Sequence, residues 1–305
     1  MLFSNIICEN DVTPQISRPM PLVSVVMPVR KCNPYFLEKS VESIFRQTLT
    51  DWELIVILDT TEEYGDERLF AVLKKFKNDS RMRVVVNRGN GFVEALNTGL
   101  SVSRGKYIAR MDGDDISLPN RLMLQVDSLE KLEADFVGGW AYVIDEHGRT
   151  IGKLTPPTDA KRIRRTIMLH NPFLHSAVIF KKSILKRSGL YNSALFGAED
   201  YDLWLRLVSL GYKCINVPYF VIRLRETSNS VLRGGQWKKT RTNYAKVKSL
   251  ALTKLGYTDP ISISLCFLSP FSVLIGPSLA LNVKFLFGWL REDSLRPIET
   301  EIANG

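Results

Sequence analysis

Three carboxylates stand within four consecutive positions, at Asp112, Asp114 and Asp115. Like charges at this spacing repel each other, so folding by itself gains little from gathering them. A hard divalent cation relieves the repulsion, because carboxylate oxygens are the ligands that such ions prefer and Mg²⁺ also recruits substrate phosphates. We therefore expect Mn²⁺ or Mg²⁺ at this cluster, with Gly113 allowing a tight turn between the first two acids. The alternative is an acidic turn or a helix cap before Pro119.

Other charged residues that could do chemistry are Arg30, Asp59 and the adjacent acids Glu199 and Asp200. Glu199 and Asp200 open an amphipathic stretch, where acids commonly cap a helix and complement its dipole. Asp59 follows an apolar run, which is a common place for a turn residue. Each of these acids, taken singly, has a purely structural explanation.

Several phosphate-binding and nucleophile motifs are missing from the sequence. It contains no GxxxxGK[ST] and no GxGxxG after its first apolar run, which argues against P-loop NTPases and Rossmann dehydrogenases. It has no GxSxG elbow of an α/β-hydrolase and no 12-residue EF-hand spacing. A nucleotide-binding α/β sheet that uses a carboxylate-held metal remains among few possibilities.

Apolar runs alternating with helical periodicities predict the elements that position these residues. Predicted strands are 23–29, 52–58, 83–86, 107–111, 136–143, 176–180, 213–217 and 220–224, and predicted helices are 35–47, 66–77, 91–103 and 199–210. This alternation predicts an α/β fold with a mostly parallel sheet covered by helices on both faces. Ligands bind beyond the carboxyl ends of such strands, where Arg30, Asp59 and Asp112 fall.

The composition is that of a globular protein, with 305 residues and 45% hydrophobic side chains. Its four cysteines lack CxxC spacing, so we expect neither a zinc site nor a disulfide framework. Reduced cysteines in a cytoplasmic protein are expected instead. The first apolar stretch ends at Glu9, too early for a secretory signal. Residues 1–21 are interpreted as an irregular lead-in.

The C-terminal part combines a basic stretch with an uncharged one. Residues 233–254 hold seven Lys and Arg and no acid, and residues 260–283 hold no charged side chain. A solvated helix face, an anionic membrane or nucleic acid could each explain the basic stretch. Residues 260–283, interrupted by Pro270 and Pro277, could be interfacial or re-entrant helices, a membrane span or soluble core.

Four stretches of the chain, in order, resemble the family 2 glycosyltransferases, which have the GT-A fold and are mostly inverting. These stretches are VSVVMPVRKCNPYFLEKSVESIFRQTLTDWELIVILD (23–59), GFVEALNTGLSVSRGKYIARMDGDDISLPNRLMLQ (91–125), NPFLHSAVIFKKSILKRSGLYNSALFGAEDYDLWLRL (171–207) and RLRETSNS (223–230). The resemblance implies a GT-A domain over 22–232. The basic and uncharged stretches after it predict a helical, membrane-associating tail over 233–305.

The resemblance also implies roles for particular residues. Asp59 would bind the nucleobase edge, and Pro28 and Arg30 would line the nucleotide pocket. Asp112 and Asp114 would form the DxD pair, with Asp112 near the ribose and Asp114 on the metal.

The same resemblance makes Asp200 the catalytic base and Glu199 its support. Two positions depart from the family pattern. Leu58 stands where a second acid often precedes Asp59, and Arg225 stands where a histidine is common. Whether Arg225 contacts the diphosphate is left open.

The expected function is transfer of a sugar from a nucleotide-sugar, with inversion of the anomeric centre. A UDP-sugar is the first choice of donor. The acceptor would be a saccharide or a polyprenyl-linked sugar, in synthesis of a surface polysaccharide such as O-antigen or capsule. The protein would lie on the cytoplasmic face of the cell membrane, with an anionic membrane surface and no nucleic acid as its partner. The alternatives are a non-catalytic module that docks on membrane or nucleic acid, and a sugar-phosphate nucleotidyltransferase.

Overall fold

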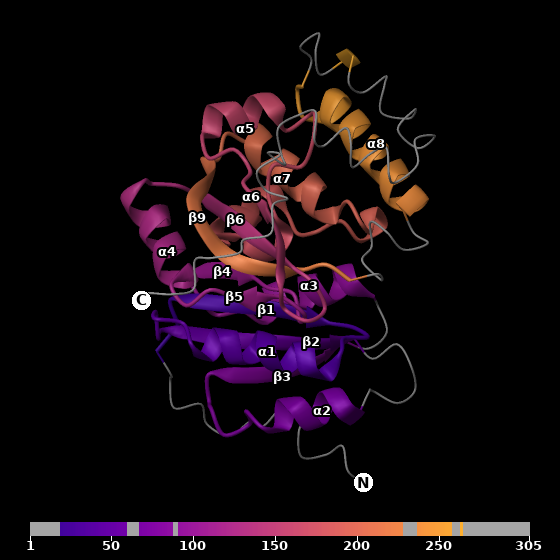
Figure 1. Ribbon diagram of the computed structural model, residues 1–305. Coiled ribbons are helices and arrows are strands. Elements are labelled where there is room, and N and C mark those ends of the chain that lie inside the picture. Colours follow the sequence, from indigo (N-terminus) through magenta and orange to yellow (C-terminus); the bar gives the residue numbers. More distant parts are fainter. Residues whose placement is uncertain (1–18, 60–66, 88–90, 228–236, 258–262, 265–305) are drawn as a thin grey trace.

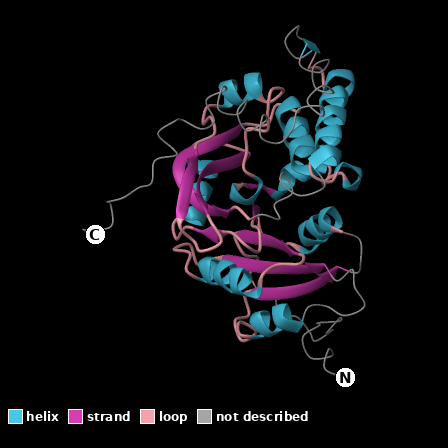
Figure 2. Ribbon diagram, turned by 45° about the vertical axis from the view of Figure 1, so that its right-hand side comes forward, coloured by secondary structure: helices cyan, strands magenta, loops and turns pink. Residues whose placement is uncertain are grey.

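The structure is a computed structural model that describes residues 19–59, 67–87, 91–227, 237–257 and 263–264. In this part of the chain, one mixed sheet runs through the centre and helices cover both of its faces (Figures 1 and 2). Most of the lead-in over 1–21 and nearly all of 260–283 lie outside the described residues. Among the described helices, none is long and apolar enough to cross a membrane.

The sheet has the strand order β3-β2-β1-β4-β8-β6-β9-β5, and β7 pairs with β6. Its strands are β1 (Val23–Val29), β2 (Trp52–Asp59), β3 (Met82–Asn87), β4 (Tyr107–Arg110), β5 (Ile116–Ser117), β6 (Phe136–Ile144), β7 (Thr150–Leu154), β8 (Ile179–Lys181) and β9 (Cys214–Arg225). The helices are α1 (Pro34–Phe45), α2 (Glu67–Lys74), α3 (Phe92–Val102), α4 (Arg121–Lys131), α5 (Ala160–Thr166), α6 (Leu185–Ser188), α7 (Glu199–Ser209) and α8 (Trp237–Lys254), with short 3₁₀ helices η1 (His175–Ala177), η2 (Lys182–Ile184) and η3 (Ser193–Leu195).

Strands β1 to β4 form the predicted parallel half of the sheet. The side chains of β1, β2 and β4 are buried on both faces, as the continuous apolar runs indicate, whereas those of the edge strand β3 are mostly half-buried. Along β1, Val25 and Met27 face the core under α1, α2 and α4, whereas Val26 faces the core under α3 and α7. This alternation follows from the two-residue period of a strand.

The prediction of a mostly parallel sheet is wrong for the second half. Strand β8 is antiparallel to β4 and β6, and β5 is antiparallel to β9. Strands β6 and β7 are joined by the five residues 145–149, and so short a link joins antiparallel strands only. The predicted strand 176–180 begins only at Ile179, because residues 175–177 form η1.

The two strands predicted at 213–217 and 220–224 are one strand, β9. It pairs in parallel with β6, and the register shifts where Val217 opposes Gly139 and Phe220 opposes Trp140. The shift accommodates Pro218, which has no N–H to donate to a ladder. Strand β9 thereby continues to Arg225, which places its end beside the Asp112–Asp115 cluster.

Candidate active site

The parallel strands bring the three predicted side chains Arg30, Asp59 and Asp112 to one edge of the sheet, together with Asn87, which was not predicted. Arg30 follows β1, Asp59 ends β2, Asn87 ends β3 and Asp112 follows β4. Asp59 and Asn87 are register partners, and Asn87 Nδ2 donates to Asp59 Oδ1 at 3.2 Å. Pro28, the remaining predicted pocket residue, is buried within β1.

Asp59 has a buried carboxylate with one oxygen left over. Its side chain is 1% exposed, and its Oδ2 lies 3.5 Å from Nε of the half-exposed Arg30. This oxygen accepts no hydrogen bond from any described residue. Because a buried carboxylate oxygen without a hydrogen bond is costly, an N–H of a bound ligand would stabilise it.

The acid cluster is compact enough to hold a cation. Carboxylate oxygens of Asp112, Asp114 and Asp115 lie within 4.8 Å of one another. Burial, and then the charge of Asp112, raise the pKa of Asp114 to about 6. Asp115 turns inward, since its Oδ1 accepts from the backbone N–H of Arg225 at 2.7 Å. Asp112 and Asp114 therefore fit a divalent metal, which would relieve their repulsion.

The structure gives a different reason for a glycine at position 113 from the one predicted. Its φ is not among the positive values found in the described residues, so no left-handed turn requires a glycine here. A Cβ at this position would lie 3.1 Å from Val29 Cγ2, so the limit is close packing. The loop is also tied to its neighbours, because Ser40 Oγ donates to the Asp112 carbonyl at 2.9 Å. Cys32 Sγ contacts the Gly113 carbonyl at 3.3 Å.

Glu199 and Asp200 open α7 as predicted, but Glu199 is buried and Asp200 is only partly exposed, so neither lies on a fully solvated cap. Asp200 Oδ2 accepts from Asn171 Nδ2 at 2.8 Å, and Glu199 accepts from the backbone N–H of Gly197. Burial raises the pKa of Asp200 to about 6. Burial, and then the charge of Asp200, raise the pKa of Glu199 to about 7. Such values suit a general base near neutral pH.

Arg110 connects the acid cluster to the acid pair. Its side chain is 3% exposed and forms an ion pair with Asp112. Its positive charge also lowers the pKa values of Asp114 and Asp200, although burial outweighs it at both. Sequence reasoning missed this residue, and the only available signal was a cation inside an apolar strand immediately before the acids.

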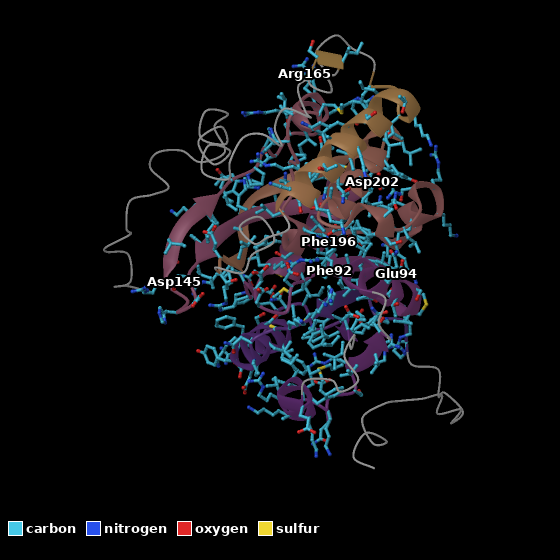
Figure 3. All side chains as sticks on the ribbon, turned by 90° about the vertical axis from the view of Figure 1, so that its right-hand side faces the viewer. Phe92, Glu94, Asp145, Arg165, Phe196 and Asp202 are labelled. Carbon is cyan, nitrogen blue, oxygen red and sulfur yellow. The ribbon has the colours of Figure 1, made fainter. Side chains whose placement is uncertain are left out.

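An aromatic contact lies at the same junction. Figure 3 shows Phe92 and Phe196 side by side, and their ring centroids are 6.3 Å apart with the rings edge to face. Phe92 begins α3 and Phe196 precedes α7, while the Arg110 guanidinium lies 5.6 Å from the Phe92 ring. The contact packs the turn before Glu199 against the β1–β4 half of the sheet.

Two further residues complete this region and were not predicted: the partly exposed His175 and the buried Tyr191. His175 Nε2 lies 3.1 Å from Tyr191 Oη, and the backbone of Tyr191 is held at both N–H and carbonyl by the side chain of Asn97. Burial, and then Arg110, hold the pKa of His175 well below its usual 6.5, so the ring is neutral. Burial raises the pKa of the Tyr191 hydroxyl above its usual 10.0, and the charges of Asp200 and Glu199 raise it further.

Arg225, whose role was left open, forms hydrogen bonds with the backbone of the acid cluster and of the loop beside it. Its Nε donates to the Asp114 carbonyl and its Nη1 to the Asp145 carbonyl, each at 2.9 Å. Its guanidinium lies 4.0 Å from the Phe36 ring centroid, a cation–π distance. These contacts fix the backbone that carries Asp114 and Asp115.

The chain matches a protein-family model described as "Glycosyl transferase family 2" over residues 24–190. It is 33% identical to the amylovoran biosynthesis glycosyltransferase AmsE of Erwinia amylovora, over 74% of this chain and 85% of that protein. It is also 33% identical to the O-antigen biosynthesis glycosyltransferase WbnJ of Escherichia coli, over 66% of this chain and 76% of that protein.

Among solved structures, the chain is similar in fold to S. aureus TarS. Residues 1–349 of TarS in complex with UDP-GlcNAc give a TM-score of 0.60 at 15% identity, over 76% of this chain and 66% of that one. A longer TarS chain gives a TM-score of 0.56, and the match spans 40% of its length.

Proposed function

The chain belongs to glycosyl transferase family 2 and is a glycosyltransferase; on this premise we propose that it is metal-dependent and inverts the anomeric centre of a nucleoside-diphosphate sugar. The observation that carries the proposal is the pairing of two acidic sites across one arginine. Arg110 forms an ion pair with Asp112 at the sheet edge, and its charge lowers the pKa values of Asp114 and of the partly exposed Asp200. The proposed donor site and the proposed base thus both lie within the electrostatic influence of Arg110.

The nucleotide would lie at the sheet edge formed by β1 and β2. Asp59 Oδ2, which accepts no hydrogen bond from the described residues, suits an N–H of a nucleobase, and Arg30 beside it would close the pocket that Pro28 lines. A UDP-sugar is the proposed donor, because TarS, which shares this fold, has been solved with UDP and with UDP-GlcNAc.

The diphosphate would lie at Asp112 and Asp114. A divalent metal bound there supplies positive charge to the departing nucleoside diphosphate. The residues of this chain hold that site in shape: Arg110 pairs with Asp112, and Arg225 bonds to the Asp114 carbonyl. Asp112 would also approach the ribose.

Asp200 would act as the base. The acceptor oxygen forms a bond to the anomeric carbon, the bond from that carbon to the diphosphate oxygen breaks, and the acceptor proton passes to Asp200. One displacement from the opposite face inverts the anomeric centre. Asn171 keeps the Asp200 carboxylate oriented, and Glu199 supports it at the start of α7.

The proposed setting is the synthesis of a surface polysaccharide at a membrane. Two relatives are named for amylovoran and O-antigen biosynthesis, which favours a saccharide or polyprenyl-linked acceptor. Helix α8 exposes Lys238, Lys239 and Lys246, which would attract an anionic cytoplasmic leaflet.

The experiment that tests the proposal is a panel of nucleotide-sugars with Mn²⁺, scored for the released product. We expect nucleoside diphosphate from one donor, loss of release in EDTA and restoration by Mn²⁺. Asp114→Ala should show the same loss with an unchanged circular dichroism spectrum. Release of pyrophosphate would indicate a nucleotidyltransferase instead, and no release with any donor would indicate a non-catalytic docking module.

A further inference from the structure

Arg121 is a buried cation at the first position of α4, the helix that packs on β6, β8 and β9 (Figure 1). Burying a guanidinium costs free energy, and a positive charge at the start of a helix also opposes the helix dipole. Within the described part of the chain, Arg121 bonds to carbonyl, amide and thioether groups and forms no ion pair. The reason for an arginine here therefore lies in the groups to which it donates.

Two of these groups belong to the residues directly before Asp112. Arg121 Nη2 donates to the Arg110 carbonyl at 2.7 Å, and Nη1 donates to Met111 Sδ at 3.2 Å. Nη2 also donates to the Val178 carbonyl at 3.3 Å, and this same carbonyl accepts from the backbone N–H of Arg110 at 3.0 Å. Arg121 thus fixes the backbone of β4 at its last residue, where the acid cluster begins.

Gln125 holds Arg121 from the next turn of α4, since residues four apart lie on the same face of a helix. Gln125 is fully buried, and its Oε1 accepts from Arg121 Nε at 3.1 Å. Its Nε2 donates to the Ala177 carbonyl at 2.7 Å and to the Val137 carbonyl at 3.4 Å. The two side chains therefore tie β4, η1 and β6 to one helix, at the junction between the parallel and antiparallel halves of the sheet.

We propose that Arg121 is a positioning residue for the metal site: by holding the Arg110 carbonyl, it sets where the carboxylates of Asp112 and Asp114 lie. The proposal rests on the metal-dependent function proposed above. Arg110 matters twice, because its backbone leads into the acid cluster and its side chain forms the ion pair with Asp112. Groups outside the ligand set commonly determine metal affinity by orienting the ligands.

Arg121→Lys tests the geometry apart from the charge, because lysine keeps the positive charge but lacks the planar fork of donors. We expect the Kd of Mn²⁺ alone, measured by electron paramagnetic resonance of the free ion, to rise about tenfold. Arg83→Lys is the matched control. Arg83 Nη2 also donates to a carboxylate and a carbonyl, those of Glu53 and Val102, but near the amino end of β3. This control should leave the Kd of Mn²⁺ unchanged.

Hydrogen exchange tests the same contact without a metal. The backbone N–H groups of Arg110 and Met111 donate to the carbonyls of Val178 and Val26, so their exchange reports local opening of this backbone. In Arg121→Lys without Mn²⁺ we expect these two amides to exchange about tenfold faster, the factor that one charge-assisted hydrogen bond corresponds to, relative to the amides of β2. Equal acceleration in both places would reflect a loss of global stability alone and would overturn the proposal.

Gln125→Met is the second variant, which decides the matter if Arg121→Lys does not fold. It keeps the guanidinium and removes one of its partners, so the Kd of Mn²⁺ should rise about two- to fivefold. Wild-type affinity for Mn²⁺ in a folded Arg121→Lys would overturn the proposal, as would wild-type affinity in Gln125→Met if that is the only variant that folds. A wild type that binds no Mn²⁺ would remove the metal-dependent function, while the exchange rates would still decide whether Arg121 holds the backbone before Asp112.

Discussion

At the residue scale, ionisation of the acids with raised pKa values in the site lowers the stability of the folded protein. A carboxyl group whose pKa is higher in the folded state binds its proton more tightly there, so the folded state loses stability as pH rises through that interval. For Glu199 the interval runs from the usual 4.5 to about 7. Raised carboxyl pKa values of this kind are typical of catalytic sites.

Glu199→Gln should therefore stabilise the protein at alkaline pH. We expect its free energy of unfolding to exceed that of the wild type by about 1–3 kcal/mol at pH 8, and the gain to shrink at pH 5. Urea denaturation in EDTA at both pH values measures the difference. Glu67→Gln, at an exposed position of α2, is the control and should show no such pH dependence. Equal gains for Glu199→Gln at pH 5 and pH 8 would contradict the assignment.

Asp59→Asn tests the nucleotide pocket. The unpaired Oδ2 of Asp59 is expected to accept from the nucleobase, so replacing the carboxylate with an amide should raise the Kd of the donor about 10- to 100-fold. Calorimetry with the nucleoside diphosphate measures this directly. Asp51→Asn, at an exposed position just before β2, should leave the Kd unchanged. An Asp59 variant with wild-type affinity would place the nucleobase elsewhere.

The sequence was most informative for residues that stand in compact local patterns. Asp112 and Asp114 could be selected because three acids within four positions have few structural reasons to gather, whereas Glu199 and Asp200, which could simply cap a helix, were selected through the family resemblance. Arg110 and its neighbours could not be selected this way, since their importance arises from contacts between distant segments. Asn171 meets Asp200 across 29 positions, and no local spacing encodes that contact.

At the element scale, the long apolar strands and amphipathic helices of the first half were predictable from periodicity. The failures were short or irregular elements. Strand β8 has three residues, too few to show an alternation, and β9 contains Pro218, which reads locally as a break. Helix α8 is mostly polar, so its buried stripe is narrow, and a solvated or membrane-bound face was an equally good interpretation of its lysines.

Gly197→Ala tests the packing of α8 on the turn before α7. Gly197 has φ +81°, and a Cβ there would lie 2.5 Å from Thr240 Oγ1. Gly211 has φ +85° with nothing within 4 Å of its Cβ position, so Gly211→Ala reports the backbone strain alone. We expect Gly197→Ala to lower the free energy of unfolding by about 1–3 kcal/mol more than Gly211→Ala. Equal losses would mean that α8 does not pack on this turn.

At the scale of the whole molecule, α8 exposes Lys238, Lys239 and Lys246 outside its buried stripe of Thr240, Asn243, Val247 and Ala251. Replacing Lys238, Lys239 and Lys246 with Gln should weaken binding to vesicles of anionic lipid, by about 1 kcal/mol for each charge near the surface. Co-sedimentation at low salt measures it. The control replaces three exposed lysines elsewhere, Lys74, Lys77 and Lys131. If both triple variants bind vesicles as the wild type does, α8 is not a membrane-docking face.

The central claim is that a base at Asp200 serves a donor held at Asp112 and Asp114. The most direct measurement is kcat of Asp200→Asn at saturating donor and acceptor, with the donor Kd measured on the same sample. Because Asn is nearly isosteric but cannot take the acceptor proton, kcat should fall by about 10²- to 10⁴-fold while the Kd stays the same. A variant that turns over within about threefold of the wild type would contradict the claim, since general-base catalysis contributes far more than that.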